Sequence, residues 1–112
     1  MQADLYEGFQ EHWAANFARR MEERTGAALA TRDPDARRRA LEDALELGKE
    51  ARLRMESGPT HNEAERAALS HLQDALDLVQ AALNAFDVCH DPPIREALEH
   101  AAQAAGALEQ VG

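Results

Sequence analysis

The sequence predicts an all-α protein, an antiparallel up-down-up-down four-helix bundle. Alanine, leucine, arginine and glutamate dominate the chain, and all four rank high in helix propensity. Signals that start and stop helices recur along the sequence, whereas no segment shows the two-residue alternation of a β-strand. The chain has 112 residues, an ordinary size for one domain, so residues 1–112 are expected to form a single helical bundle.

Four helices are expected, over residues 3–30, 34–57, 60–89 and 92–111. Gly26 offers an earlier end for the first of them. The last two connections are very short, so successive helices should lie side by side and run in opposite directions.

Each of the last three helices begins with a capping signal. Asp33 is followed by Pro34 at the first helical position, and Asp91 is followed by Pro92 in the same way. Thr60 is the expected N-cap of the third helix, because a glutamate follows three residues later as in a capping box.

The third helix carries an apolar stripe with alternating three- and four-residue steps, which predicts burial. We expect Leu72, Leu76, Val79 and Leu83 to be nearly fully buried, with Phe86 continuing the stripe. A second stripe lies beside the first and widens the buried face, so the third helix is predicted to be the central element. Its members are Ala68, His71, Ala75, Leu78, Ala82, Ala85 and Cys89.

The first and fourth helices have complementary side-chain sizes. The first carries four of the five aromatic residues, whereas the inner side of the fourth is mostly alanine. Large side chains that face small ones fill a bundle evenly, which predicts that these two helices are neighbours.

The formal net charge of −9 argues against a nucleic-acid partner, because nonspecific affinity for nucleic acids comes from neutralising phosphates. The one local basic candidate is the run of three arginines at 37–39. No apolar stretch has membrane-spanning length, and the first residues carry acids where a signal peptide has bases. The single cysteine, Cys89, agrees with a reducing compartment, so we expect a soluble cytoplasmic protein with no membrane association.

Two segments, "RAALSH" and "REALEH", place an arginine and a histidine five positions apart, as Arg66 with His71 and Arg95 with His100. They resemble the arginine–histidine signature of HEPN domains, small all-α bundles that include metal-independent ribonucleases. The resemblance implies that Arg95 would bind phosphate and His100 would transfer a proton, usually across a dimer. It also implies that the chain could be an RNase or a component of a toxin–antitoxin pair.

The residues themselves favour a non-catalytic interpretation of both segments. Five residues turn a helix by about 500°, so the arginine and the histidine lie about 140° apart. Glu96 and Glu99 flank the second pair and would repel a phosphate. We therefore predict no catalytic residues.

The turn "DVCHD" contains side chains of the kinds that bind zinc: Asp87, Cys89, His90 and Asp91. Neighbouring residues at a helix end point in different directions, and Asp91 is expected as a cap. The sequence also lacks the Glu-x-x-His motif of di-iron bundles. We therefore predict no metal ligands and no cofactor. His71 is expected to be a buried histidine with one hydrogen bond, or a source of pH sensitivity at an oligomer seam.

The function that the sequence favours is association. The first helix carries apolar and aromatic residues over a broad arc, and Trp and Tyr are enriched at interface hot spots. The candidate interface residues are Tyr6, Phe9, Trp13 and Phe17. We predict a helical bundle that self-associates or binds a protein partner, with a HEPN-like ribonuclease and a metal-binding bundle as the alternatives.

Overall fold

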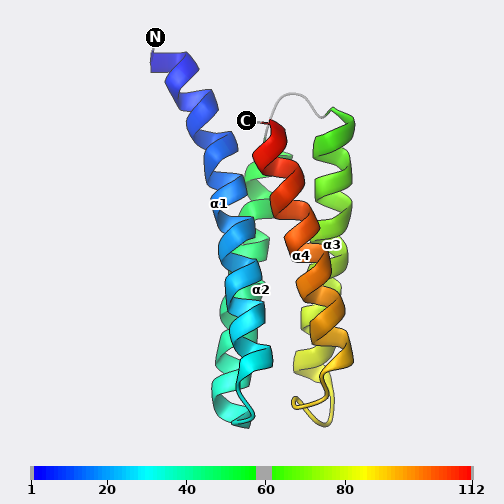
Figure 1. The fold of residues 1–112 in the computed structure, drawn as a ribbon. Helices are drawn as coiled ribbons and strands as arrows, with labels where there is room; N and C mark the ends of the chain where they lie inside the picture. The colour runs from blue at the N-terminus through cyan, green and yellow to red at the C-terminus, as the bar shows by residue number, and fades with distance from the viewer. Residues whose placement is uncertain (1, 58–61, 112) are drawn as a thin grey trace.

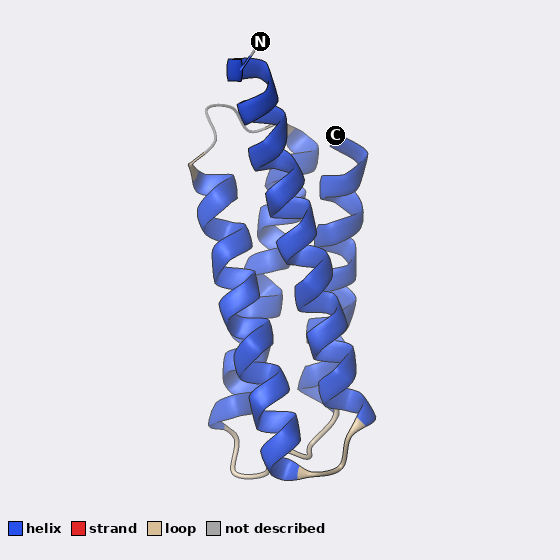
Figure 2. Ribbon diagram, turned by 90° about the vertical axis from the view of Figure 1, so that its left-hand side faces the viewer, coloured by secondary structure: helices blue, strands red, loops and turns tan. Residues whose placement is uncertain are grey.

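The computed structural model describes residues 2–57 and 62–111, and it describes the side chains of residues 14–57 and 62–109. Its four helices are α1 (Gln2–Ala30), α2 (Pro34–Glu56), α3 (Glu63–Asn84) and α4 (Pro92–Val111). Successive helices run in opposite directions (Figure 1), which is the antiparallel four-helix bundle that the sequence predicts. The described part of the chain contains no strand (Figure 2).

The helices pack as a ring of four. Helix α1 packs against α2 and α4, and α3 packs against α4 and α2. The prediction that the first and fourth helices are neighbours is therefore confirmed. The prediction that the third helix is central is wrong, because each helix occupies one corner of the ring and none is surrounded by the others.

The start of α2 follows the predicted capping signal. The Asp33 carboxylate accepts a hydrogen bond from the backbone N–H of Ala36 at 3.0 Å, and Pro34 occupies the first helical position. Upstream, Gly26 does not end α1, which continues to Ala30. The packing of α1 against two neighbours offsets the low helix propensity of a single glycine.

Helix α3 begins later than predicted. Thr60 lies outside the described residues, and the N-cap is Asn62, whose side chain accepts a hydrogen bond from the backbone N–H of Glu65 at 2.8 Å. Asparagine is as good a cap as threonine, and a glutamate also follows it three residues later. The sequence therefore held two overlapping capping signals, and the second one starts the helix at Glu63.

Helix α3 also ends earlier than predicted, at Asn84 instead of Cys89. Ala85 has an extended backbone with ψ of 151°, and the Asp87 carboxylate accepts a hydrogen bond from the backbone N–H of Cys89 at 2.9 Å. This local bond gives the backbone an alternative to the helix. As a consequence Phe86 lies in the connection and is fully exposed, so the prediction that it continues the apolar stripe is wrong.

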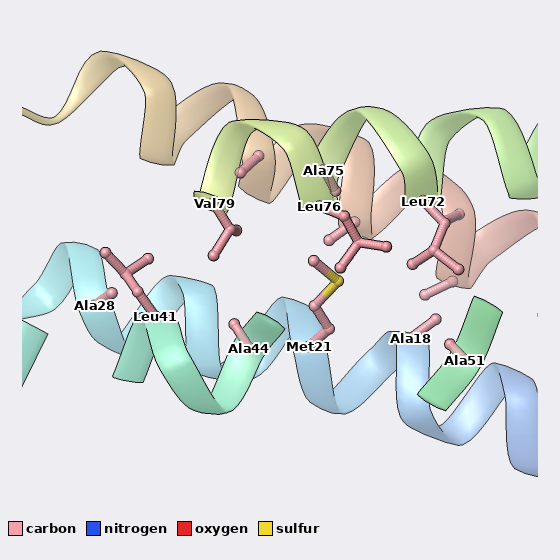
Figure 3. Close-up of a cluster of buried hydrophobic side chains, with 14 of the residues drawn as sticks. Ala18, Met21, Ala28, Leu41, Ala44, Ala51, Leu72, Ala75, Leu76 and Val79 are labelled. Atoms are coloured by element: carbon pink, nitrogen blue, oxygen red, sulfur yellow. The ribbon is translucent and has the colours of Figure 1, made fainter. Parts of the chain in front are cut away.

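The core is built mostly from alanine, which accounts for 14 of the 23 buried apolar residues that the structure describes. Figure 3 shows the larger side chains, with Met21 of α1 directed toward Leu76 of α3. Leu72, Leu76 and Val79 are buried as predicted. Leu83 is only partly buried, because α3 ends one residue after it.

Helix α2 comes very close to its neighbours at Gly48. A Cβ placed on this residue would lie 2.6 Å from Leu76 Cδ2 and 2.8 Å from Met21 Sδ. Both side chains are buried, so the missing Cβ of Gly48 is what lets three helices meet at this level.

Candidate functional site

The histidines of the two arginine–histidine segments lie against each other. His71 projects from α3 and His100 from α4, and their Nδ1 atoms are 3.0 Å apart. The ring centroids are 5.3 Å apart with an angle of 32° between the ring planes, so the two nitrogens point nearly straight at each other. Both side chains are partly buried. At this distance the Nδ1 atom that carries the hydrogen donates a hydrogen bond to the other Nδ1.

The arginines of the same two segments are not part of this contact. Arg95 approaches Asp91, one turn earlier in the chain, with Nη2 3.6 Å from the carboxylate, and its side chain is 71% exposed. Arg66 is exposed on α3. Within one chain, Arg95 and His100 therefore contact different partners, and a joint role in phosphate chemistry would need residues from a second chain.

The arginine run at 37–39 does not form the basic patch that the sequence suggested, because Arg37 is completely buried. Its guanidinium donates a hydrogen bond from Nη1 to Asp91 Oδ1 at 2.7 Å and another from Nε to the Thr31 carbonyl at 3.1 Å. Longer contacts of 3.4 Å reach the carbonyls of Leu29 and Val88. Arg37 thus joins the α1–α2 connection to the α3–α4 connection.

Asp91 is the anionic centre of this end of the bundle. The hydrogen bond from Arg37 lowers the pKa of the Asp91 carboxyl below its ordinary value, although partial burial opposes the shift. Arg32 and Arg95, at 3.5 and 3.6 Å, add their positive charge in the same direction. Asp91 precedes α4 as the predicted cap residue, but its carboxylate binds arginines of both helical hairpins.

Three of the four candidate side chains in the "DVCHD" turn contact other groups of the protein. Asp87 accepts the hydrogen bond from the Cys89 backbone, and Asp91 binds Arg37. The Cys89 thiol lies 3.6 Å from the carbonyl oxygen of Arg32. In the part of the chain that the structure describes, no three side chains of His, Cys, Asp or Glu come together as metal ligands.

The candidate interface on the first helix lies at the end of the bundle where α1 extends beyond the end of α4. Helix α1 has 29 residues and α4 has 20, and Figures 1 and 2 both show the N-terminal end of α1 beyond the ends of the other helices. Arg19 forms an ion pair of 2.7 Å with Glu109, which is only two residues from the end of α4. Most of α1 before Arg19 therefore has no part of α4 beside it.

The side chains of the predicted interface are described only in part. Those of Tyr6, Phe9 and Trp13 lie outside the described residues. Phe17 is partly buried and packs against the core of its own chain.

Sequence reasoning missed the two most specific contacts, although a signal for one of them was present. Arg37 shares the helical spacing of the buried residues Ala40, Leu41 and Ala44, which placed it on the inner face of α2. The contact between His71 and His100 depends on the register between α3 and α4, which no local pattern specifies.

Comparisons with protein-family models, with curated proteins and with solved structures find no match for this chain. No helix among the described residues combines the length and the apolar character needed to cross a membrane.

Proposed function

We propose that this four-helix bundle functions by self-association, and that two copies join through the N-terminal half of α1. The observation that supports this proposal is the length of α1. Arg19 pairs with Glu109, only two residues before α4 ends, so most of α1 before Arg19 has no part of α4 beside it.

The sequence of this segment suits burial against a second helix. Leu5, Phe9, Trp13 and Phe17 follow one another at intervals of four residues, which keeps them within about 120° of arc on a helix, and Tyr6 falls within the same arc. Such a stripe on a helix is the pattern of a buried face. Phe17 packs against the core of its own chain, but most of α1 before it has no part of α4 beside it. We expect the same segment of a second copy to lie against those turns with the same chemistry.

Charge opposes this association. The chain carries a formal net charge of −9, and its first seventeen residues contain three carboxylates and no arginine or lysine. The apolar stripe of α1 must therefore supply the favourable free energy of association. The single cysteine supports placing this association in a reducing compartment such as the cytoplasm.

Sedimentation velocity over a range of protein concentrations tests the proposal. We expect the wild type to sediment as a species heavier than the 12.3 kDa chain and to dissociate on dilution. The double variant Tyr6→Ser with Phe9→Ser should remain at the mass of one chain. It keeps Trp13, the only tryptophan, whose fluorescence should shift to longer wavelength as the wild type dissociates.

Phe86→Ser is the matched control, because Phe86 is an exposed aromatic residue in the connection between α3 and α4, at the other end of the bundle. It should associate as the wild type does. Circular dichroism confirms that each variant is folded. A wild type that sediments as one chain at every concentration, or a double variant that associates like the wild type, would contradict the proposal.

A further inference from the structure

The paired histidines of α3 and α4 have a second chemical capacity besides their mutual hydrogen bond. Imidazole nitrogens are common ligands of divalent transition metals, and metal sites in bundles are built from side chains of facing helices. His71 and His100 supply one nitrogen each from two adjacent helices, with 3.0 Å between the Nδ1 atoms. The geometry points to a divalent metal site at this pair, with Cu²⁺ and Ni²⁺ as the preferred ions and water in the remaining coordination positions.

The distance between the nitrogens is already close to what a shared ion needs. Two nitrogens that each lie about 2.0–2.1 Å from one metal are about 2.8–3.4 Å apart when the N–metal–N angle is about 90–110°, and the observed separation is 3.0 Å. Tetragonal coordination by nitrogen and oxygen is typical of Cu²⁺ and Ni²⁺.

The rings must turn before they can share an ion. In the hydrogen-bonded pair each Nδ1 points along the line that joins the rings, whereas a bound metal lies to one side of that line. Each ring therefore has to rotate by roughly 40–45° to aim its lone pair at the metal. The terminal torsion of histidine has a broad energy profile, and both side chains are partly exposed, so this rotation does not require repacking of the core.

The partial exposure of the pair also provides the rest of the coordination shell. No third His, Cys, Asp or Glu of the described residues joins the two histidines as a ligand group. Water must fill the open positions, and solvent reaches the pair at its exposed side. The bound ion would clasp α3 to α4 and would stabilise the folded bundle, because the unfolded chain does not hold the two nitrogens together. This site is independent of the association proposed for α1.

Isothermal titration of the wild-type protein with NiCl₂ and with CuCl₂ tests the inference, together with thermal melts in the presence of each ion. We expect one ion per chain. At a free Ni²⁺ concentration about 100 times the dissociation constant, the melting temperature should rise by about 10–12 °C. ZnCl₂ should bind more weakly than CuCl₂, because nitrogen ligands have a higher affinity for Cu²⁺ than for Zn²⁺.

Single substitutions distinguish a shared site from two independent histidines. His71→Ala and His100→Ala should each lower the affinity by about tenfold or more, because the second nitrogen binds intramolecularly once the first is in place. His90→Ala is the matched control, since His90 is exposed in the connection between α3 and α4, and it should leave affinity and stoichiometry unchanged.

NMR gives a readout that does not depend on stability. Sub-stoichiometric Cu²⁺ should broaden the ring protons of His71 and His100 before those of the other three histidines. Equal broadening of all five histidines would overturn the inference, as would an unchanged affinity in either single variant.

Discussion

The close approach of three helices at Gly48 predicts an unusual response to alanine. In the interior of a helix, replacing glycine by alanine normally stabilises a protein by about 0.8–1.0 kcal/mol. The new methyl group at position 48 would, however, lie 2.6 Å from a terminal carbon of Leu76 and 2.8 Å from the sulfur of Met21. Ordinary contacts need roughly 3.5–4.0 Å, so these side chains would have to move by about 1 Å.

The magnitude follows from how little space these neighbours have. Leu76 is 4% exposed and Met21 is 0% exposed, and they belong to two different helices, so neither can turn into solvent. Overpacking of a filled core costs about 1–3 kcal/mol, and the gain in helix propensity offsets about 1 kcal/mol of this cost. We expect Gly48→Ala to lower the free energy of unfolding by up to about 2 kcal/mol.

Two other helical glycines provide matched controls. A Cβ at Gly106 would meet nothing within 4 Å, and one at Gly26 would touch only Leu98 at 4.0 Å. Gly106→Ala and Gly26→Ala should therefore each raise stability by about 0.5–1 kcal/mol. Urea denaturation followed by circular dichroism at 222 nm measures all three variants. The packing argument is refuted if Gly48→Ala is as stable as Gly106→Ala.

Two further predictions concern Asp91 and the arginine–histidine segments. Arg37 lowers the pKa of Asp91, so the contribution of the Asp91 carboxylate to stability should be complete above about pH 4 and should be lost as the pH falls further. Asp91→Asn should therefore be less stable than the wild type at pH 7. Urea melts should show this difference shrinking toward pH 2. A constant difference across that range would argue against the ion pair. We also expect the purified protein not to cleave RNA in the absence of divalent metal; cleavage that disappears in Arg95→Ala with His100→Ala would instead support the HEPN-like mechanism.

Local signals were sufficient to predict the helical architecture but not the precise ends of α3. Asp33 and the proline after it mark the start of α2 without competition, and the structure agrees. The end of α3 was harder, because Ala85 and Phe86 continue the helical spacing while Asp87 binds the backbone two residues later. The spacing of apolar residues does not show whether a continued helix or the local bond to the Asp87 carboxylate is lower in free energy.

The contacts between helices required information that a single stretch of sequence does not contain. His71 was placed correctly on a face that meets another helix, but its partner depends on how far α4 slides along α3. The burial of Arg37 could have been predicted from its helical spacing to the buried residues of α2. However, Arg37 belongs to a run of three arginines, and this run suggested a basic patch on the surface. The predicted interface of α1 remains a proposal, which rests on the uncovered length of that helix.

The Arg37–Asp91 pair also determines how the two helical hairpins are held together. It joins the two helical hairpins at the end where the α1–α2 and α3–α4 connections lie side by side, and the contact of the Cys89 thiol with the Arg32 carbonyl lies at the same end (Figure 1). The chain itself joins the two hairpins at the opposite end of the bundle, where α3 follows α2. The hairpins are therefore tied at both ends, covalently at one and through Arg37 and Asp91 at the other. Loss of the pair would free one end only, so in Asp91→Asn amide hydrogen exchange should speed up most in the helix ends beside the α1–α2 and α3–α4 connections.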